Sequence, residues 1–196
     1  EIVVAAGAHS ADLVSNCMGE FCPLDTERGY SITFPPSSDE MISRAVCDPS
    51  YGWIATPMAG GLRVAGKVEM GGREAPPSAE ILDKIEQEAR VLLGGSLGER
   101  VRSKDWLGFR PTMPDALPVV GRSRKLPESV FYAFGHQHVG WTLGGITGKL
   151  VAEMAVGKAP SVDLEAYRLD RFRVRNQSNP LSRRNVAGIQ QQQQQQ

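Results

Sequence analysis

The chain has 196 residues, of which 41% are hydrophobic and 22% are charged, a balance that supports a packed core of ordinary size. Lysine plus arginine equals aspartate plus glutamate, at 22 each, and no long basic run occurs. Nucleic-acid binding is therefore not expected, because phosphates require clustered positive charge. No apolar run approaches the ~20 residues that a membrane-spanning helix needs.

The three cysteines, Cys17, Cys22 and Cys47, make an odd number and lack CxxC spacing. A disulfide framework and a zinc site are both disfavoured, so we expect a reducing, cytoplasmic compartment. His136 and His138 lie two residues apart but have no evident third partner, so no metal is predicted.

Both ends of the chain have unusual sequences. The chain begins without Met. Residues 2–6 are apolar and are followed by Gly7, a pattern that predicts a strand buried on both faces. We therefore expect that a segment preceding it is missing or comes from a partner chain. At the other end, residues 173–196 are polar, finish in seven glutamines, and are expected to form a poorly ordered tail.

The first half of the chain favours β-structure. After the strand at residues 2–6, Ser10 is expected to cap a short helix. Alternating apolar residues then predict an antiparallel sheet of three or four strands, with a hairpin around the Ala-Gly-Gly of residues 59–61. Its strands are expected at residues 29–34, 41–47, 53–56 and 62–68.

The second half begins with a helix. Ser78 follows two prolines and starts an amphipathic helix that Gly94 ends. Short strands are then expected near residues 100–109, 117–120 and 130–134. A second long helix covers residues 140–156, and residues 161–172 form a short helix or a loop. This order indicates an α+β fold, in which an antiparallel lobe is inserted into an α/β nucleotide-binding domain.

Arg110 is the first candidate for chemistry. It lies between an apolar run and a proline, so its backbone is expected to be extended and its side chain to be oriented by packing. A guanidinium held in this way can bind a carboxylate through two parallel hydrogen bonds. The alternative is a surface ion pair with Asp115 or another acid.

A second candidate is the segment FGHQHVGWT at residues 134–142, directly before the second long helix. Glycines permit close approach of a ligand, and free N–H groups at a helix start attract anionic or carbonyl oxygens. The alternative is a glycine-rich turn with ordinary helix caps. No GxGxxG motif follows a strand, and GGITGK at residues 144–149 lacks the first glycine and the Ser or Thr of a phosphate-binding loop.

Two blocks carry a family resemblance. Residues 106–121 (WLGFRPTMPDALPVVG) and 135–160 (GHQHVGWTLGGITGKLVAEMAVGKAP) resemble the C-terminal blocks of FAD-dependent D-amino-acid dehydrogenases, within the wider D-amino-acid oxidase and glycine oxidase superfamily. Residues 3–8, 28–33 and 51–69 resemble the strand that packs on FAD, the entry to the substrate lobe and a carboxylate-binding hairpin.

The resemblance extends over residues 1–172 and implies a division of the chain. Residues 1–27 and 101–172 would be parts of a Rossmann-like FAD-binding α/β domain, residues 28–100 an antiparallel-sheet substrate-binding lobe, and residues 173–196 the tail. The N-terminal GxGxxG segment of such a domain is missing from this chain.

The resemblance also implies roles for individual residues. Arg110 would bind the substrate carboxylate with Tyr51 as a helper, although Tyr51 can equally be a packed aromatic at a strand edge. The backbone of Ala6 and Gly7 would approach FAD. The flavin ring would be enclosed by residues of the second block, namely Gly135, His136, Val139, Gly140, Trp141 and Thr142.

The implied activity is oxidative deamination of a D-amino or imino acid to a 2-oxo acid, by hydride transfer from the substrate α-carbon to flavin N5. Electrons would pass to a respiratory acceptor, with the protein cytoplasmic or peripheral on the inner membrane. Two alternatives stay open: a glycine or sarcosine oxidase-type enzyme, and a non-catalytic binding subunit that pairs with a separate flavin chain.

Overall fold

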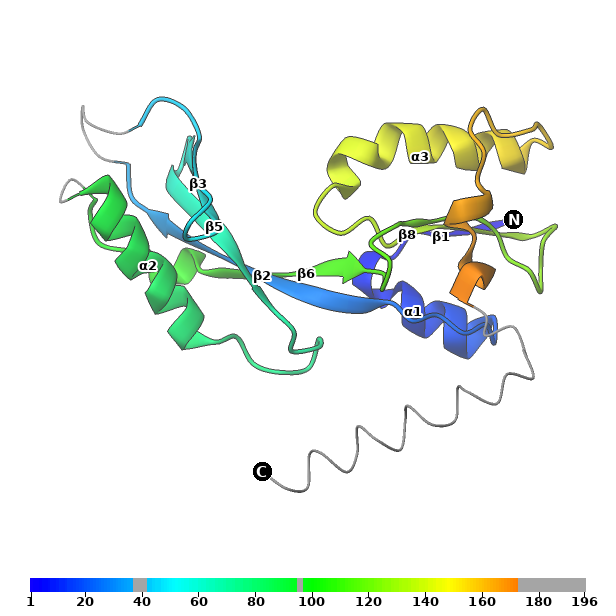
Figure 1. Cartoon of the computed structure of the whole chain (residues 1–196), viewed down its shortest axis with the longest axis horizontal. Helices are drawn as coiled ribbons and strands as arrows, with labels where there is room; N and C mark the ends of the chain where they lie inside the picture. The colour runs from blue at the N-terminus through cyan, green and yellow to red at the C-terminus, as the bar shows by residue number, and fades with distance from the viewer. Residues whose placement is uncertain (37–41, 95–96, 173–196) are drawn as a thin grey trace, which may run out of the picture.

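A computed structural model describes residues 1–36, 42–94 and 97–172. These residues form two lobes, each built on its own sheet, and Figure 1 shows the lobes at opposite ends of an elongated molecule. The predictions for the tail at residues 173–196 lie outside the described residues. No described helix is both long and apolar enough to cross a bilayer.

The first lobe contains a five-stranded sheet in the order β3-β4-β5-β2-β6, and every neighbouring pair is antiparallel. The strands are β2 (Asp25–Phe34), β3 (Val46–Asp48), β4 (Trp53–Met58), β5 (Gly61–Glu69) and β6 (Trp106–Thr112). The expected hairpin is confirmed, because β4 and β5 pair directly across the turn between Met58 and Gly61. Strands β2 and β6 run lengthwise from this lobe toward the other one (Figure 1).

One face of this sheet packs on helix α2 (Ala79–Leu93). Alternate residues of β2, Tyr30, Ile32 and Phe34, point to that helix and are buried, because successive side chains of a strand project to opposite faces. The helix expected after Ser78 is confirmed, and Ser78 caps it, since its Oγ accepts a hydrogen bond from the Ile81 amide at 3.3 Å. The opposite face of the sheet is therefore left for other contacts.

The second lobe is a three-layer arrangement around the sheet β1-β8-β7. Strand β1 (Ile2–Val4) pairs in parallel with β8 (Val130–Phe134), which pairs antiparallel with β7 (Val119–Arg122). Helix α3 (Gly140–Ala155) covers one face, and the short segments η1 (Gly7–His9), α1 (Ser10–Asp12) and η2 (Leu13–Cys17) cover the other (Figure 1). Short turns η3 (Arg102–Lys104), η4 (Glu165–Tyr167) and η5 (Leu169–Phe172) complete the described chain.

Several local predictions are wrong. Ser10 does not cap the first helix: His9 holds the capping position, and Ser10 Oγ instead accepts from the Ala6 amide at 3.1 Å. The strand expected from residue 100 begins only at Trp106, because residues 102–104 form a 3-10 turn. The strand expected at residues 41–47 is shorter in the described part, where β3 begins at Val46.

The sheet also has more strands than predicted, because β6 joins it beside β2. The sequence assigns the strand expected at residues 100–109 mainly to the FAD-binding domain, whereas β6 pairs along seven residues of β2. The mixed α and β composition with an antiparallel lobe agrees with the expected fold class. The division of the chain at residues 27, 100 and 172 remains a prediction.

Candidate functional site

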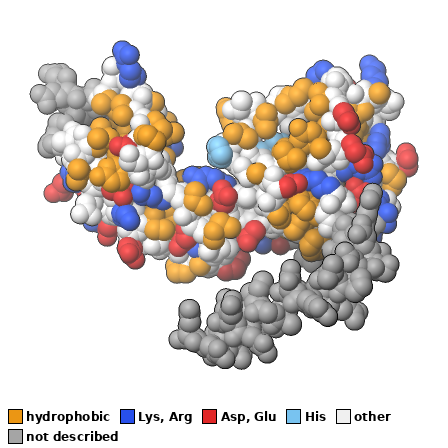
Figure 2. All heavy atoms as spheres, viewed as in Figure 1, with side chains coloured by type: hydrophobic (Ala, Val, Ile, Leu, Met, Phe, Trp, Pro, Cys, Tyr) orange, Lys and Arg blue, Asp and Glu red, His pale blue; other side chains and the backbone are white. Residues whose placement is uncertain are grey.

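An open cleft of about 740 Å³ lies on the free face of the five-stranded sheet. Its walls come from β4, β5, β6, the start of β2, and one residue of the second lobe, His138. The charged and aromatic residues that line it are Glu27, Tyr51, Trp53, Arg63, Lys67, Arg110 and His138. Figure 2 shows a hollow between the two lobes with basic side chains at its base and a histidine on its rim.

Arg110 lies on β6 with a half-buried side chain, directly across from Glu27 of β2. Its Nη1 donates a hydrogen bond to the Lys67 carbonyl oxygen at 3.2 Å. Within the described residues, Arg110 has no ion pair, and the Asp115 carboxylate is instead bound by Arg171 at 2.8 Å. The guanidinium therefore has in-plane donors available to an anion in the cleft.

Lys67 contacts two residues of the cleft, Tyr51 and Arg110, and also helix α2. Its backbone has φ of +59°, a left-handed conformation that is uncommon for a residue with a side chain. Its Nζ pairs with Glu88 Oε2 of α2 at 2.7 Å and donates to the Tyr51 carbonyl oxygen at 2.5 Å. Lys67 was not predicted as a site residue, because its role depends on the pairing of distant strands.

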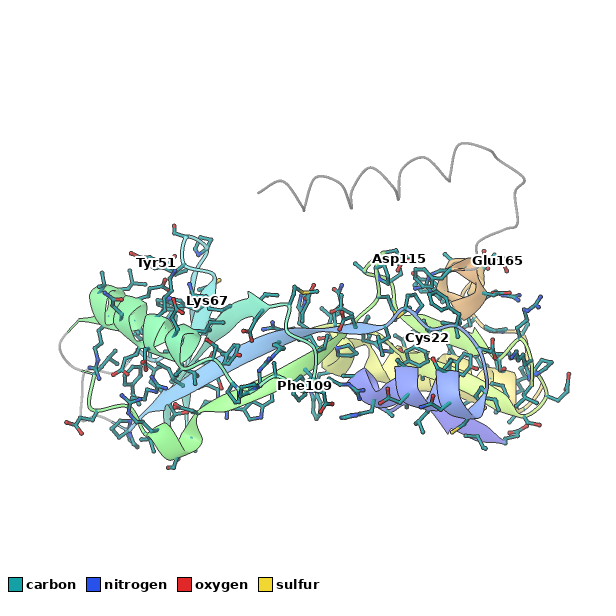
Figure 3. The ribbon with its side chains drawn as sticks, turned by 90° about the horizontal axis from the view of Figure 1, so that it is seen from below. Cys22, Tyr51, Lys67, Phe109, Asp115 and Glu165 are labelled. Atoms are coloured by element: carbon teal, nitrogen blue, oxygen red, sulfur yellow. The ribbon has the colours of Figure 1, made fainter. Side chains whose placement is uncertain are left out.

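Tyr51 lies in the turn that joins β3 to β4, at the tip of the first lobe (Figure 3). The Asp48 carboxylate accepts from its amide at 3.0 Å, which fixes the turn. Its side chain is exposed and lines the cleft. The structure thus brings Tyr51 and Arg110, the two predicted substrate residues, to one cleft, although it records no direct contact between them.

The glycine-rich segment lies where the second lobe meets the cleft. Gly135 has φ of +82° and Gln137 has φ of +51°, so the chain turns sharply after β8. The Gln137 amide donates to the Pro111 carbonyl oxygen at 2.9 Å, which ties this loop to the end of β6. His138 in the same loop lines the cleft, so the glycine-rich segment and the Arg110 cleft adjoin.

His136 contacts helix α3 and does not line the cleft. Its Nε2 lies 3.0 Å from Thr147 Oγ1 of α3, and burial lowers the pKa of its imidazole. A neutral imidazole at this position links the loop to the helix. Among the described residues, no group of three potential metal ligands occurs.

The start of α3 has backbone amides without a side-chain partner among the described residues. Its capping residue is Val139, which provides no side-chain hydrogen bond, so the first amide donors of this 16-residue helix have no capping side chain. Trp141 is fully exposed, and Val139 and Thr142 are also exposed. A side-chain carbon added at Gly144, Gly145 or Gly148 would meet no atom within 4 Å. The first amides of α3 can bind an electron-rich edge of a ligand, and the glycines without side chains leave room for a flat ring.

Ala6 and Gly7 follow the end of β1. Gly7 has φ of +54° and open space where a side chain would stand. Apolar residues beside it, including Ile2, Val3 and Leu13, are exposed and border a hollow of about 350 Å³. Ala6 and Gly7 are both partly exposed, and contact of their backbone with FAD stays a prediction.

The chain was compared with known proteins. The sequence profile of the family described as "FAD dependent oxidoreductase" matches residues 1–154. A D-amino-acid oxidase from Bradyrhizobium diazoefficiens is 40% identical over 179 residues, which cover 87% of this chain and 40% of that protein. A D-amino acid dehydrogenase from Cereibacter sphaeroides is 31% identical over 174 residues, covering 87% of this chain and 38% of that protein.

A solved structure shows that the fold is also similar to that of an amino-acid oxidase. Glycine oxidase from Geobacillus kaustophilus superposes with a TM-score of 0.69 at 23% identity, over 86% of this chain and 45% of that one. The chain belongs to the FAD-dependent oxidoreductase family that includes the D-amino-acid oxidases. It spans about 40% of the length of the curated relatives that it matches.

Proposed function

We propose that this chain provides the substrate cleft and a flavin-facing loop of an enzyme that oxidises D-amino or imino acids to 2-oxo acids. The observation that carries the proposal is that Arg110, whose Nε and Nη2 have no hydrogen-bond partner among the described residues, shares one cleft with His138 of the glycine-rich loop. Both curated relatives described above are named for D-amino acids, which favours that substrate class.

The residues that would hold the flavin ring lie around the start of α3. The amides of Gly140, Trp141 and Thr142 lack a capping side chain and would face the electron-rich edge of the ring. Ala6 and Gly7 would contact the cofactor through their backbone. FAD, when bound, supplies the acceptor for the hydride that leaves the substrate α-carbon.

The main contribution of the protein is then to orient the substrate. Arg110 binds the substrate carboxylate with two charge-assisted hydrogen bonds and so directs the Cα–H bond toward the loop at residues 135–139. The substrate amine must be neutral before its nitrogen lone pair can assist loss of the hydride. The product is an imine, which water hydrolyses to the 2-oxo acid and ammonia, and Tyr51 at the cleft wall is assigned a helping role in substrate binding.

For the electron acceptor we propose a respiratory carrier rather than oxygen, reached at the membrane surface by peripheral association. The test uses the FAD-loaded protein that contains this chain, with D-alanine, its L-enantiomer, glycine and sarcosine as substrates. We expect dye reduction with the D-amino acid and little peroxide. Rapid peroxide formation with glycine or sarcosine would point to an oxidase instead, and no turnover by flavin-loaded protein would favour a non-catalytic subunit.

A further inference from the structure

The open face of the five-stranded sheet has two glycines directly opposite one another. Gly29 of β2 pairs in register with Gly108 of β6. Arg110 is two residues beyond Gly108 on the same strand and therefore projects from the same face. Its own partner in register is Glu27, so its side chain runs diagonally across the pair of strands to reach Gly29.

The guanidinium of Arg110 occupies the space that a side chain at position 29 would need. A Cβ built on Gly29 would lie 2.4 Å from Nη2, 2.5 Å from Cζ and 2.8 Å from Nη1 of Arg110. These three similar distances mean that the flat face of the guanidinium rests on Gly29. Because its N–H groups lie in the plane of the group, this contact leaves them free for hydrogen bonds.

The backbone conformation at position 29 does not require glycine. Gly29 is absent from the glycines with positive φ, so alanine can adopt its conformation. The requirement that remains is steric and comes from Arg110. On the other side, the Lys67 carbonyl accepts from Nη1, which fixes the rotation of the guanidinium within its plane.

We infer that Gly29 is a positioning residue, which lets the Arg110 guanidinium lie flat on β2 and aim its remaining donors at a substrate carboxylate. The inference rests on the proposed function of Arg110. A methyl group at position 29 would lift the guanidinium by more than an ångström, since non-bonded carbon and nitrogen atoms separate by about 3.5 Å. Displacement of that size breaks the alignment of a bidentate pair.

The neighbouring glycine provides a matched control. A Cβ at Gly108 would meet the Trp106 ring, 1.9 Å from its nearest carbon, and Trp106 does not line the cleft. Gly108→Ala therefore places the same methyl group on the same face of the adjacent strand, but it displaces an aromatic ring instead of the guanidinium. A general disturbance of the sheet would affect both variants equally.

The experiment measures binding of benzoate, a carboxylate without an α-hydrogen, and of neutral benzamide to the FAD-loaded protein by calorimetry. Gly29→Ala should weaken benzoate binding roughly 10- to 100-fold and leave benzamide binding nearly unchanged. Gly108→Ala should change either Kd by less than about threefold. In an Arg110→Lys background, Gly29→Ala should add less than about twofold, because it acts through the guanidinium that is already gone.

The outcomes separate the inference from the proposed function. Unchanged benzoate binding in Arg110→Lys would show that Arg110 does not bind the carboxylate. If Arg110→Lys weakens benzoate binding but Gly29→Ala does not, Arg110 keeps its role and the role of Gly29 is overturned. The role of Gly29 is also overturned if Gly29→Ala weakens benzoate binding equally in the wild-type and Arg110→Lys backgrounds. Should Gly29→Ala fold poorly, its melting temperature should recover in Arg110→Ala, which vacates the space; a defect that persists there also overturns the inference.

Discussion

The Glu20 carboxylate accepts a hydrogen bond from the Tyr132 hydroxyl at 2.8 Å, in the interior of the second lobe. The same oxygen accepts from Ser123 Oγ, so residues far apart in sequence meet at one buried carboxylate. A buried charge without partners is costly, and these two hydroxyl groups compensate for its burial.

Replacing Tyr132 by phenylalanine should therefore destabilise the protein by about 1 to 3 kcal/mol, because Glu20 loses a partner while remaining buried. Urea denaturation of the purified protein measures the change in the free energy of unfolding. The control is Tyr167→Phe, since Tyr167 is not fully buried and the structure records no hydrogen bond from its hydroxyl to a described residue. Equal stability of wild type and Tyr132→Phe would contradict the assigned contact.

The same tyrosine predicts a pH dependence. Burial raises the pKa of Tyr132 well above its usual value of 10.0, and the hydrogen bond and charge of Glu20 add to the effect. The folded protein thus holds this proton more tightly than the unfolded chain. The resulting stability is fully present below about pH 10 and is lost as the pH rises further. Thermal melts between pH 8 and about pH 11 should fall more steeply for wild type than for Tyr132→Phe; parallel curves would be inconsistent with this cause.

Arg100 should be important for the stability of the first lobe. Its side chain is 3% exposed and binds Asp105 at 2.6 Å and Asp83 at 2.8 Å, which ties α2 to the segment before β6. Arg100→Met should cost about 3 to 5 kcal/mol, because it leaves Asp105 largely buried without its partner. Arg102, which is 71% exposed and 3.6 Å from Asp83, offers a matched control.

Arg102→Met should change the free energy of unfolding by less than about 0.5 kcal/mol, as is typical of exposed ion pairs. Chemical denaturation of both variants under identical conditions makes the comparison. A similar loss in the two variants would mean that net charge, and not the buried network around Arg100, determines stability here.

Local sequence signals predicted the helices well and the pairing of distant strands poorly. Helices α2 and α3 were expected within a residue or two of their observed bounds, because apolar spacing, Ser78 and the glycines beyond each helix are local features. The ten-residue length of β2 was underestimated, since Asp25, Thr26 and Glu27 do not alternate with apolar residues.

The candidate site shows the same limit. Arg110 was selected from its own segment and its resemblance, but its contact with the Lys67 carbonyl spans 43 positions in sequence and depends on strand register. Gly29 lies in the block at residues 28–33, but no role of its own could be predicted, because the need for glycine there comes from a side chain on another strand. Lys67 was also not predicted, since its positive φ lies where β5 shifts register against β2, which depends on the pairing of distant strands.

The most discriminating prediction concerns Arg110→Lys in the FAD-loaded protein that contains this chain. Lysine keeps the positive charge but loses the planar fork that binds a carboxylate through two parallel hydrogen bonds. The loss should be about 2 to 4 kcal/mol of transition-state stabilisation, which corresponds to a decrease in kcat/KM of roughly 30- to 1000-fold. Flavin content and melting temperature should barely change, because the proposed flavin contacts lie just after β1 and around the start of α3.

The decisive comparison uses a D-amino acid and its amide, which lacks the carboxylate charge. The wild-type enzyme should strongly prefer the acid, and Arg110→Lys should lose most of that preference. If Arg110 were only a structural surface residue, the substitution would cost less than about 1 kcal/mol and the preference would persist. An undiminished preference would place the carboxylate site elsewhere in the cleft, where Lys67 and Arg63 are the remaining cations among the described lining residues.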